Sequence, residues 1–248
     1  MSNDPGNAND SIQNGEASPI LTSNDSKRLS LLDIVQEGIR TQNANRVNRM
    51  VLVGELTSTN DVQAFVNAIS ENKSKVEGKL TGLTFIINKT AFITVIEGTF
   101  DSLIDYLQGL SNRNSTGHFM SSDRVLTSVE DVERMFPIWD VRMKRVPKAE
   151  QNDFSSENLA QTAFESVKHL LVLGAALQGM NKTKCSEFLD SQKREVMSSI
   201  PSSELISFYA RLTTLFPIDN YLDVFYRNPV KIDLDGERVF PVEPFLEY

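Results

Sequence analysis

The stretch TGLTFIINKTAFITVIEG, at positions 81–98, constrains the fold more than any other part of the chain. Two apolar runs flank a short polar turn at Asn88 and Lys89. Runs rich in β-branched and aromatic residues on both sides of such a turn are typical of a β-hairpin whose strands are largely buried. The elements before and after this hairpin therefore decide the architecture.

Patterns on both sides of the hairpin complete the order β-α-β-β-α-β, with one further strand. We expect the first helix to begin at Thr59 or Asn60 and the second to end near Gly109. This order predicts an α+β fold, a ferredoxin-like sandwich, which is a scaffold that hosts many unrelated functions. The expected elements around the hairpin are strand 50–53, helix 62–69, helix 100–110, strand 124–129, helical turn 130–135 and strand 139–143.

Composition divides the chain into four parts. The first part is mostly Asn, Ser, Asp and Gly with few large apolar residues, so it buries too little surface to offset its ordering entropy. The second carries apolar residues such as Leu31 and Ile34 at helical spacing. The four expected parts are a disordered tail at 1–28, a short helix at 29–45, the compact domain at 46–147 and a helical extension at 148–248.

The extension is predicted to be mostly helical and to end in a β-hairpin. Ser202 or Ser203 is expected to cap its third helix. Asp235-Gly236 stands between two alternating runs, which is a strong local signal for a hairpin. The expected elements are helices at 157–180 and 185–200, a third helix containing 205–212, a helical turn or two at 220–227, and strands at 231–234 and 237–240.

Charge and cysteine content limit the classes of function. The net charge of −8 disfavours nonspecific binding to nucleic acid or to anionic membranes. No apolar run approaches the roughly 18 residues of a membrane span, and the N-terminus lacks the pattern of a secretory signal. The single cysteine, Cys185, excludes an internal disulfide and fits a reducing compartment. We expect a cytoplasmic protein with no nucleic-acid or membrane partner.

Candidate catalytic groups are few and isolated. His118 and His169 are the only histidines, and neither has the spacing of a metal site with Cys185. Glu97 at a strand end has the chemistry of a general acid or base, but a place in the turn before a helix is favoured by about five to one. The nucleophile motif Gly-x-Ser-x-Gly and a glycine-rich phosphate loop are both missing. We expect no catalytic site, no metal site and no enzyme.

A basic cluster and an aromatic cluster in the sequence each have two possible interpretations. A basic cluster on the last strand would either bind an acidic protein surface, such as that of tubulin, or guard an exposed strand edge against aggregation. An aromatic cluster in the extension would be either a second core or partly an interface. The basic cluster is Arg142, Lys144 and Arg145; the aromatic cluster is Phe208, Tyr209, Phe216, Tyr221, Phe225 and Tyr226.

Residues 49–146 resemble a BLUF domain, the blue-light sensor module that uses FAD. The resemblance is carried by the apolar first strand, by Thr81-Gly82-Leu83 at the start of the hairpin, by FITVIEG at 92–98, and by Phe136-Pro137-x-Trp139 with Met143. It implies the ferredoxin-like fold predicted above. It also implies a place for a flavin in this domain, if the residues that the family uses for it are present.

The residues that the BLUF family uses for photochemistry are replaced here. The family's first-strand tyrosine corresponds to Leu52, and its flavin-contacting glutamine corresponds to Thr94. Leucine has no hydroxyl group, and threonine has no amide carbonyl to accept a hydrogen bond. Asn72, Trp139 and Met143 remain at positions that the resemblance links to the flavin site. We expect that no flavin or other cofactor is bound.

The segment YRNPVKIDLDGERVF, at 226–240, resembles the end of the eukaryotic testis-expressed protein forty-seven family. That resemblance covers most of residues 29–241 and implies expression in cells that build motile flagella, with a place in the axoneme. We therefore expect a non-catalytic structural protein of the cilium or sperm flagellum, bound to axonemal or cytoskeletal proteins through its BLUF-like domain. The alternative is a sensor domain that still binds flavin or another nucleotide.

Overall fold

The computed structural model describes residues 30–32, 34, 46–76, 80–147, 154, 156–191 and 193–228. The chain divides into two units, Met1–Thr41 and Gln42–Tyr248. In the first unit Leu31, Leu32 and Ile34 lie in a helical turn and expose their side chains. The predicted tail at 1–28, most of the short helix at 29–45 and the terminal hairpin at 231–240 lie outside the described residues.

The described strands of the second unit form one five-stranded sheet in the order β4-β1-β3-β2-β5. β5 runs parallel to β2, and the other neighbouring strands are antiparallel. The first four strands have the topology of a ferredoxin-like sandwich, so the predicted fold class is confirmed. The strands are β1 (Arg46–Leu56), β2 (Thr81–Ile87), β3 (Ala91–Gly98), β4 (Met120–Glu133) and β5 (Trp139–Lys144).

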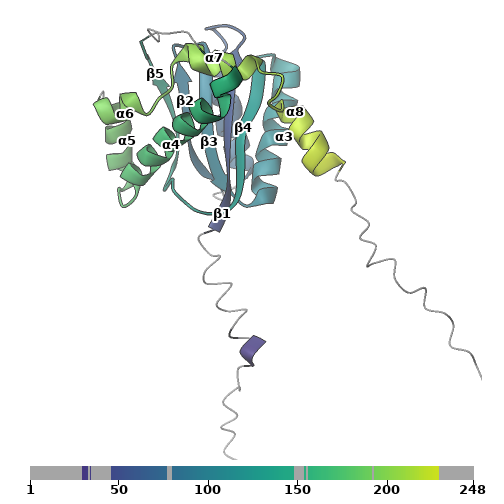
Figure 1. Ribbon diagram of the computed structural model, residues 1–248, viewed down its shortest axis with the longest axis vertical. Helices are drawn as coiled ribbons and strands as arrows, with labels where there is room; N and C mark the ends of the chain where they lie inside the picture. The colour runs from purple at the N-terminus through teal and green to yellow at the C-terminus, as the bar shows by residue number, and fades with distance from the viewer. Residues whose placement is uncertain are drawn as a thin grey trace, which may run out of the picture. The chain divides into compact units, whose positions relative to one another are not determined.

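Helices cover both faces of this sheet (Figure 1). We call the side covered by α2, α3 and α8 the α2/α3 layer, and the side covered by α4 to α7 the α4–α7 layer. Leu52 points into the first layer and Val53 into the second, which explains why the central strands are apolar at successive positions. The helices are α2 (Val62–Lys75), α3 (Phe100–Gly117), α4 (Leu159–Leu177), α5 (Lys182–Asp190), α6 (Arg194–Ser198), α7 (Ser203–Arg211) and α8 (Ile218–Leu222), with short turns η1 (Ser156–Asn158) and η2 (Asp223–Arg227).

The predicted hairpin turn is confirmed between β2 and β3. Asn88 and Lys89 have φ angles of 51° and 61°, the left-handed conformation that tight hairpin turns require. The Asn88 side chain donates to the carbonyl oxygen of Val146 at 3.0 Å and accepts from the Val146 amide at 3.1 Å. The turn is therefore fastened to the chain that leaves β5.

A buried ion pair joins the other end of the sheet. The Arg49 Nε donates to the Glu97 carboxylate at 2.7 Å, and Arg49 also donates to the carbonyl oxygen of Glu133. Glu97 is fully buried and accepts further hydrogen bonds from the backbone amides of Met135 and Phe136, each at 2.9 Å. Glu97 thus holds β1, β3 and the connection from β4 to β5 together, which is a structural role.

Two expected boundaries in the first half of the domain are wrong. α3 continues through Gly109 to Gly117, because Gly109 is a point of close approach: a Cβ there would lie 2.6 Å from the Asn72 amide oxygen on α2. Residues 130–133 of the helical turn expected at 130–135 are instead the end of β4, since Glu133 pairs with Arg46 of β1. In both cases a tertiary contact outweighed a local signal.

Of the boundaries and helix caps considered next, one is confirmed and two are wrong. The single helix expected at 185–200 is two helices, which allows Leu189 of α5 and Val196 of α6 both to be fully buried. Ser202 caps α7 as expected, accepting from the Leu205 amide. The cap expected at Thr59 or Asn60 is wrong, because the residue before α2 is Asp61, whose side chain makes no capping bond.

We predict that Glu97→Gln lowers the free energy of unfolding by about 3 kcal/mol, because it leaves the Arg49 charge buried without a counter-charge. Urea unfolding followed by circular dichroism measures the loss. The matched control is Asp131→Asn, which breaks the ion pair of Arg46 and Asp131, whose side chains are 45% and 69% exposed. That loss should stay below about 1 kcal/mol. Equal losses in the two variants would contradict the structural role of Glu97.

Candidate functional site

The two positions that the sequence analysis matches to the photochemical residues of BLUF domains lie opposite each other in the α2/α3 layer. Leu52 of β1 and Thr94 of β3 are direct cross-strand partners, and both are buried. The Thr94 hydroxyl is 3.0 Å from the hydroxyl of Thr84 on β2, and this pair satisfies both groups. The sequence analysis missed Thr84, although a polar residue inside the apolar run of β2 was a visible signal.

Apolar side chains pack around this threonine pair. Phe65 of α2 lies against Phe92 of β3 with ring centroids 4.5 Å apart, and Ile69 and Ile104 are also buried in the cluster. At positions 52 and 94 the layer offers one aliphatic side chain and one hydrogen-bonded hydroxyl. Neither side chain is a tyrosine that can transfer an electron and a proton.

Two polar groups in the same layer stand out because they are buried without a hydrogen-bond partner among the described residues. They are the amide of Asn72, which is 1% exposed, and the hydroxyl of Tyr106. Burial raises the pKa of the Tyr106 phenol far above its ordinary value, so this group stays protonated. Unpaired buried polar groups cost about 1–3 kcal/mol each. This layer therefore carries a cost that packing alone does not explain.

Trp139 and Met143, the other two positions that the resemblance links to the flavin site, lie at different distances from the core of this layer. The Trp139 ring packs edge-on against Tyr106 with centroids 5.4 Å apart, so α3 and β5 meet beside the unpaired hydroxyl. Met143 lies at the sheet edge opposite Ile86 and is 61% exposed. The structure thus brings Asn72 and Trp139 into one layer and leaves Met143 at its rim. Tyr106 was missed because its spacing on α3 is that of a core residue.

The basic cluster expected on the last strand is only partly free, and the expectation is wrong for Arg142. Arg142 donates to Asp140 at 2.7 Å and to Ser186 of α5 at 2.6 Å, and it lies 3.3 Å from Asp190. It therefore joins β5 to α5. Arg145 remains exposed and makes no ion pair with any described residue.

The cysteine and the histidines stay apart. Cys185 is fully buried, and desolvation together with the nearby Asp140 raises the pKa of its thiol, which makes it a poor nucleophile. His118 ends α3 in a left-handed conformation, and His169 is exposed on α4. Among the described residues no group of His, Cys, Asp and Glu is arranged to hold a metal ion. Within the same residues, no helix has the length and apolar character needed to span a membrane.

The aromatic cluster divides between core and surface. The Tyr209 hydroxyl bonds Ser166 at 3.1 Å in the α4–α7 layer, and the Tyr221 hydroxyl bonds Ser128 at 3.1 Å on the opposite side. Tyr209 fits the second-core interpretation, whereas Tyr221 is buried in the core of the α2/α3 layer. Phe216, Phe225 and Tyr226 are each nearly half exposed, so the interface interpretation stays open for them.

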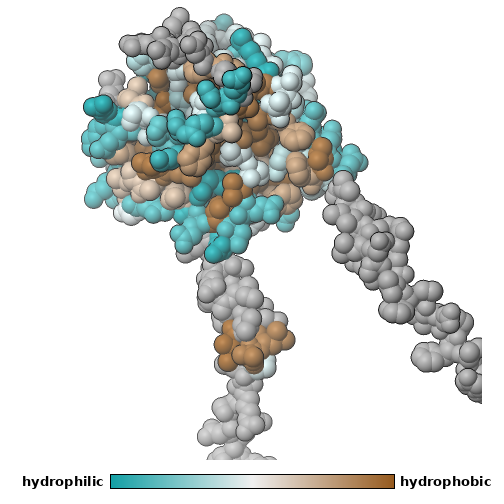
Figure 2. Space-filling model, in the orientation of Figure 1, coloured by the Kyte–Doolittle hydropathy of each residue, from teal (hydrophilic) through white to brown (hydrophobic). Residues whose placement is uncertain are grey.

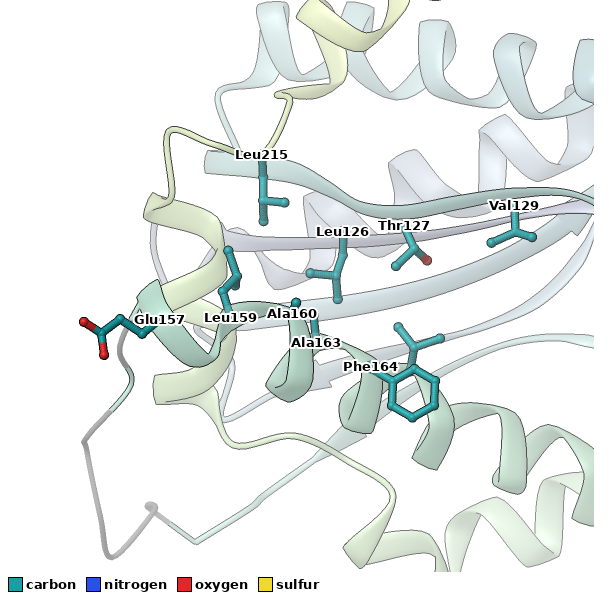
Figure 3. A pocket seen from close by; sticks show the side chains of 10 residues that line it. Leu126, Thr127, Val129, Glu157, Leu159, Ala160, Ala163, Phe164 and Leu215 are labelled. Atoms are coloured by element: carbon teal, nitrogen blue, oxygen red, sulfur yellow. The ribbon is translucent and has the colours of Figure 1, made fainter.

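An apolar groove of about 660 Å³ lies between the edge strand β4 and helix α4 (Figure 3). Figure 3 shows Leu126 and Thr127 of β4 pointing toward α4, and Phe164 on α4 is 62% exposed. Hydrophobic surface gathers along α4 in Figure 2. The lining, which we call the β4–α4 groove, is Leu126, Thr127, Val129, Glu157, Leu159, Ala160, Ala163, Phe164, Val167 and Leu215. The sequence analysis did not find it, because it joins residues that are far apart in the chain.

Comparison with known proteins gives one family and several solved structures. The family model described as "Testis-expressed protein 47" matches residues 46–227, which is most of the chain. No curated protein matches.

The solved structures include the dark state of BlrB, a BLUF protein, at 15% identity and a TM-score of 0.37, covering 54% of this chain and 98% of that one. The BLUF domain of BlrP1 matches at 16% identity and a TM-score of 0.32, covering 54% and 90%. A bacterial light-regulated adenylyl cyclase matches at 15% identity and a TM-score of 0.31, covering 62% and 40%. The match spans less than half of that cyclase chain.

We predict that Asn72→Leu raises the free energy of unfolding by about 1 kcal/mol, because it removes a buried amide that has no partner and keeps a similar volume. Urea unfolding of the full chain measures the change. Asn67→Leu is the control, since Asn67 is exposed on the same helix, and it should change stability by only a few tenths of a kcal/mol. A clear loss of stability in Asn72→Leu would contradict the prediction and indicate that the amide is satisfied in solution.

Proposed function

The chain belongs to the testis-expressed protein 47 family, and we propose that it is a non-catalytic assembly protein of the motile cilium or sperm flagellum. One observation carries the non-catalytic part. The buried pair Leu52 and Thr94 occupies the positions that a BLUF photoreceptor needs for a tyrosine and a glutamine. The flagellar part is supported by the family description, because the testis is where sperm flagella are built.

The surface that this role would use is the β4–α4 groove. Its partner is an apolar segment with basic flanks on an axonemal or cytoskeletal protein. Glu157 lines the groove and Glu130 follows Val129 along β4; neither carboxylate forms an ion pair within the described part of the chain. Two copies of the groove would bring these like charges together, which disfavours a second copy as the occupant. In this proposal neither nucleic acid nor membrane is a partner.

We predict that the protein stays with the axoneme when demembranated flagella are fractionated, and that crosslinking joins it to axonemal proteins. Phe164→Glu should reduce those crosslinks severalfold, because it places a charge in the apolar groove. Val172→Glu is the matched control, since Val172 is 58% exposed on the same helix but does not line the groove. Axonemes that contain none of the protein would overturn the proposal.

A second candidate function is a flavin- or nucleotide-binding sensor. The observation in its favour is the unpaired amide of Asn72 beside α3, together with the unpaired Tyr106 hydroxyl. A bound heterocycle with donors and acceptors would satisfy such groups. The packed apolar surroundings of Leu52 and Thr94 count against it.

We predict that the purified full-length protein is colourless and stays so after incubation with FAD and gel filtration. The physical reason is that Leu52 and Thr94 offer no amide to the flavin ring. Absorbance between about 350 and 500 nm checks this directly. A yellow protein whose spectrum shifts reversibly under blue light would favour the sensor and contradict the assembly role.

A further inference from the structure

A second hollow, of about 480 Å³, lies at the edge of the sheet where β2 and β5 end. Its apolar floor includes Ile86 of β2 and the exposed Met143 of β5. Its charged rim carries only cations. We call this the basic hollow, and it is lined by Ile86, Asn88, Lys89, Met143, Lys144 and Arg145.

The rim is positively charged, whereas the whole chain has a net charge of −8. Lys89 and Arg145 are exposed and form no ion pair within the described residues. Asp190 is the acidic group that acts on Lys144, and it already lies 3.3 Å from Arg142. A local excess of positive charge on an acidic protein selects an anionic partner.

The backbone beside two of these cations is fixed by hydrogen bonds. The Asn88 amide bonds both the N–H and the carbonyl of Val146, and it also donates to Ser203 of α7 at 2.9 Å. Asn88 adjoins Lys89, and Val146 adjoins Arg145. Lys89 and Arg145 therefore lie on opposite sides of the hydrogen-bonded contact between Asn88 and Val146.

The backbone conformation of Lys89 allows its charge to be tested by a substitution that preserves the turn. Its φ of 61° is required by the tight turn between β2 and β3 and favours glycine, which has no Cβ. Lys89→Gly therefore removes the charge while keeping the turn.

The open edge of β5 indicates the shape of the occupant. β5 is the last strand of the sheet, and no described strand pairs with its outer side. The carbonyl groups of Ile138 and Lys144 accept from the amides of Gly82 and Asn88, so the backbone groups of Met143 point outward by strand alternation. The Val141 N–H, which also points outward, already donates to the Asp140 carboxylate at 2.8 Å, so Met143 offers the free backbone groups at this end of the edge. An extended peptide can add to such an edge, with its alternate side chains entering adjacent pockets.

We propose that the basic hollow and the open edge of β5 together bind an extended acidic segment of a partner protein. Carboxylates of the segment pair with Lys89, Lys144 and Arg145, and its main chain continues the sheet beyond Met143. An apolar side chain of the segment rests on Met143 and Ile86. This site is separate from the β4–α4 groove and does not depend on the flagellar role.

The test uses the full chain and a fluorescent decapeptide of alternating Glu and Val, with binding followed by anisotropy at low salt. Lys89→Gly and Arg145→Gln should each weaken binding about threefold to fivefold, because each removes one exposed charge contact. Lys89→Gly should also keep or raise the melting temperature, since glycine relieves the strained φ. Lys182→Gln, an exposed lysine on α5, is the matched control and should leave binding unchanged.

Three further probes distinguish the addition of an acidic strand from binding by charge alone and from binding of phosphate or lipid. A decapeptide of alternating Glu and Pro keeps the charge but removes half of the N–H donors, and it should bind several-fold more weakly. A peptide of alternating Lys and Val should not bind. Inorganic phosphate and phosphatidylserine vesicles should not compete at ionic strengths matched with sodium chloride. Absence of binding to the Glu–Val peptide, equal binding by all variants, or displacement by phosphate or vesicles would each overturn the proposal.

Discussion

The Arg49–Glu97 ion pair is the interaction on which the rest of the domain depends. Glu97 has no solvent to stabilise its charge, so its carboxylate must be met by donors from β1 and from the chain after β4. That requirement fixes the point from which residues 134–138 lead into β5. The position of β5 in turn sets Trp139 against Tyr106 and opens an edge strand at the far side of the sheet.

The two faces of the sheet have different consequences for function. In the α2/α3 layer, Leu52 and the hydrogen-bonded Thr84–Thr94 pair are buried together with apolar side chains. The α4–α7 layer is added by the extension, and it creates the β4–α4 groove because α4 covers β4 only in part. The β4–α4 groove therefore lies at one edge of the sheet, and the basic hollow lies at the other.

Much of the fold could be predicted from local patterns, and the errors have physical causes. The hairpin at 81–98 was predictable because its turn residues and apolar runs act over short range. The end of α3 was predicted wrongly at Gly109, because a glycine that ends a helix and a glycine that allows a neighbouring helix to pack closely cannot be distinguished in a single sequence. The candidate site was predictable only at Leu52, Thr94, Asn72, Trp139 and Met143, through resemblance to a family.

The sequence by itself determined the order of the strands and the ferredoxin-like core, because both are encoded in residue type and spacing. The match of Leu52 and Thr94 to the photochemical positions of BLUF domains came from resemblance alone. The tertiary structure alone decided that Thr84 satisfies Thr94, that Asn72 and Tyr106 are buried without partners, and that Arg142 is taken up by α5. These facts depend on which distant side chains meet. Side-chain hydrogen bonds and burial depend on which distant residues pack together, and the local sequence pattern does not reveal that.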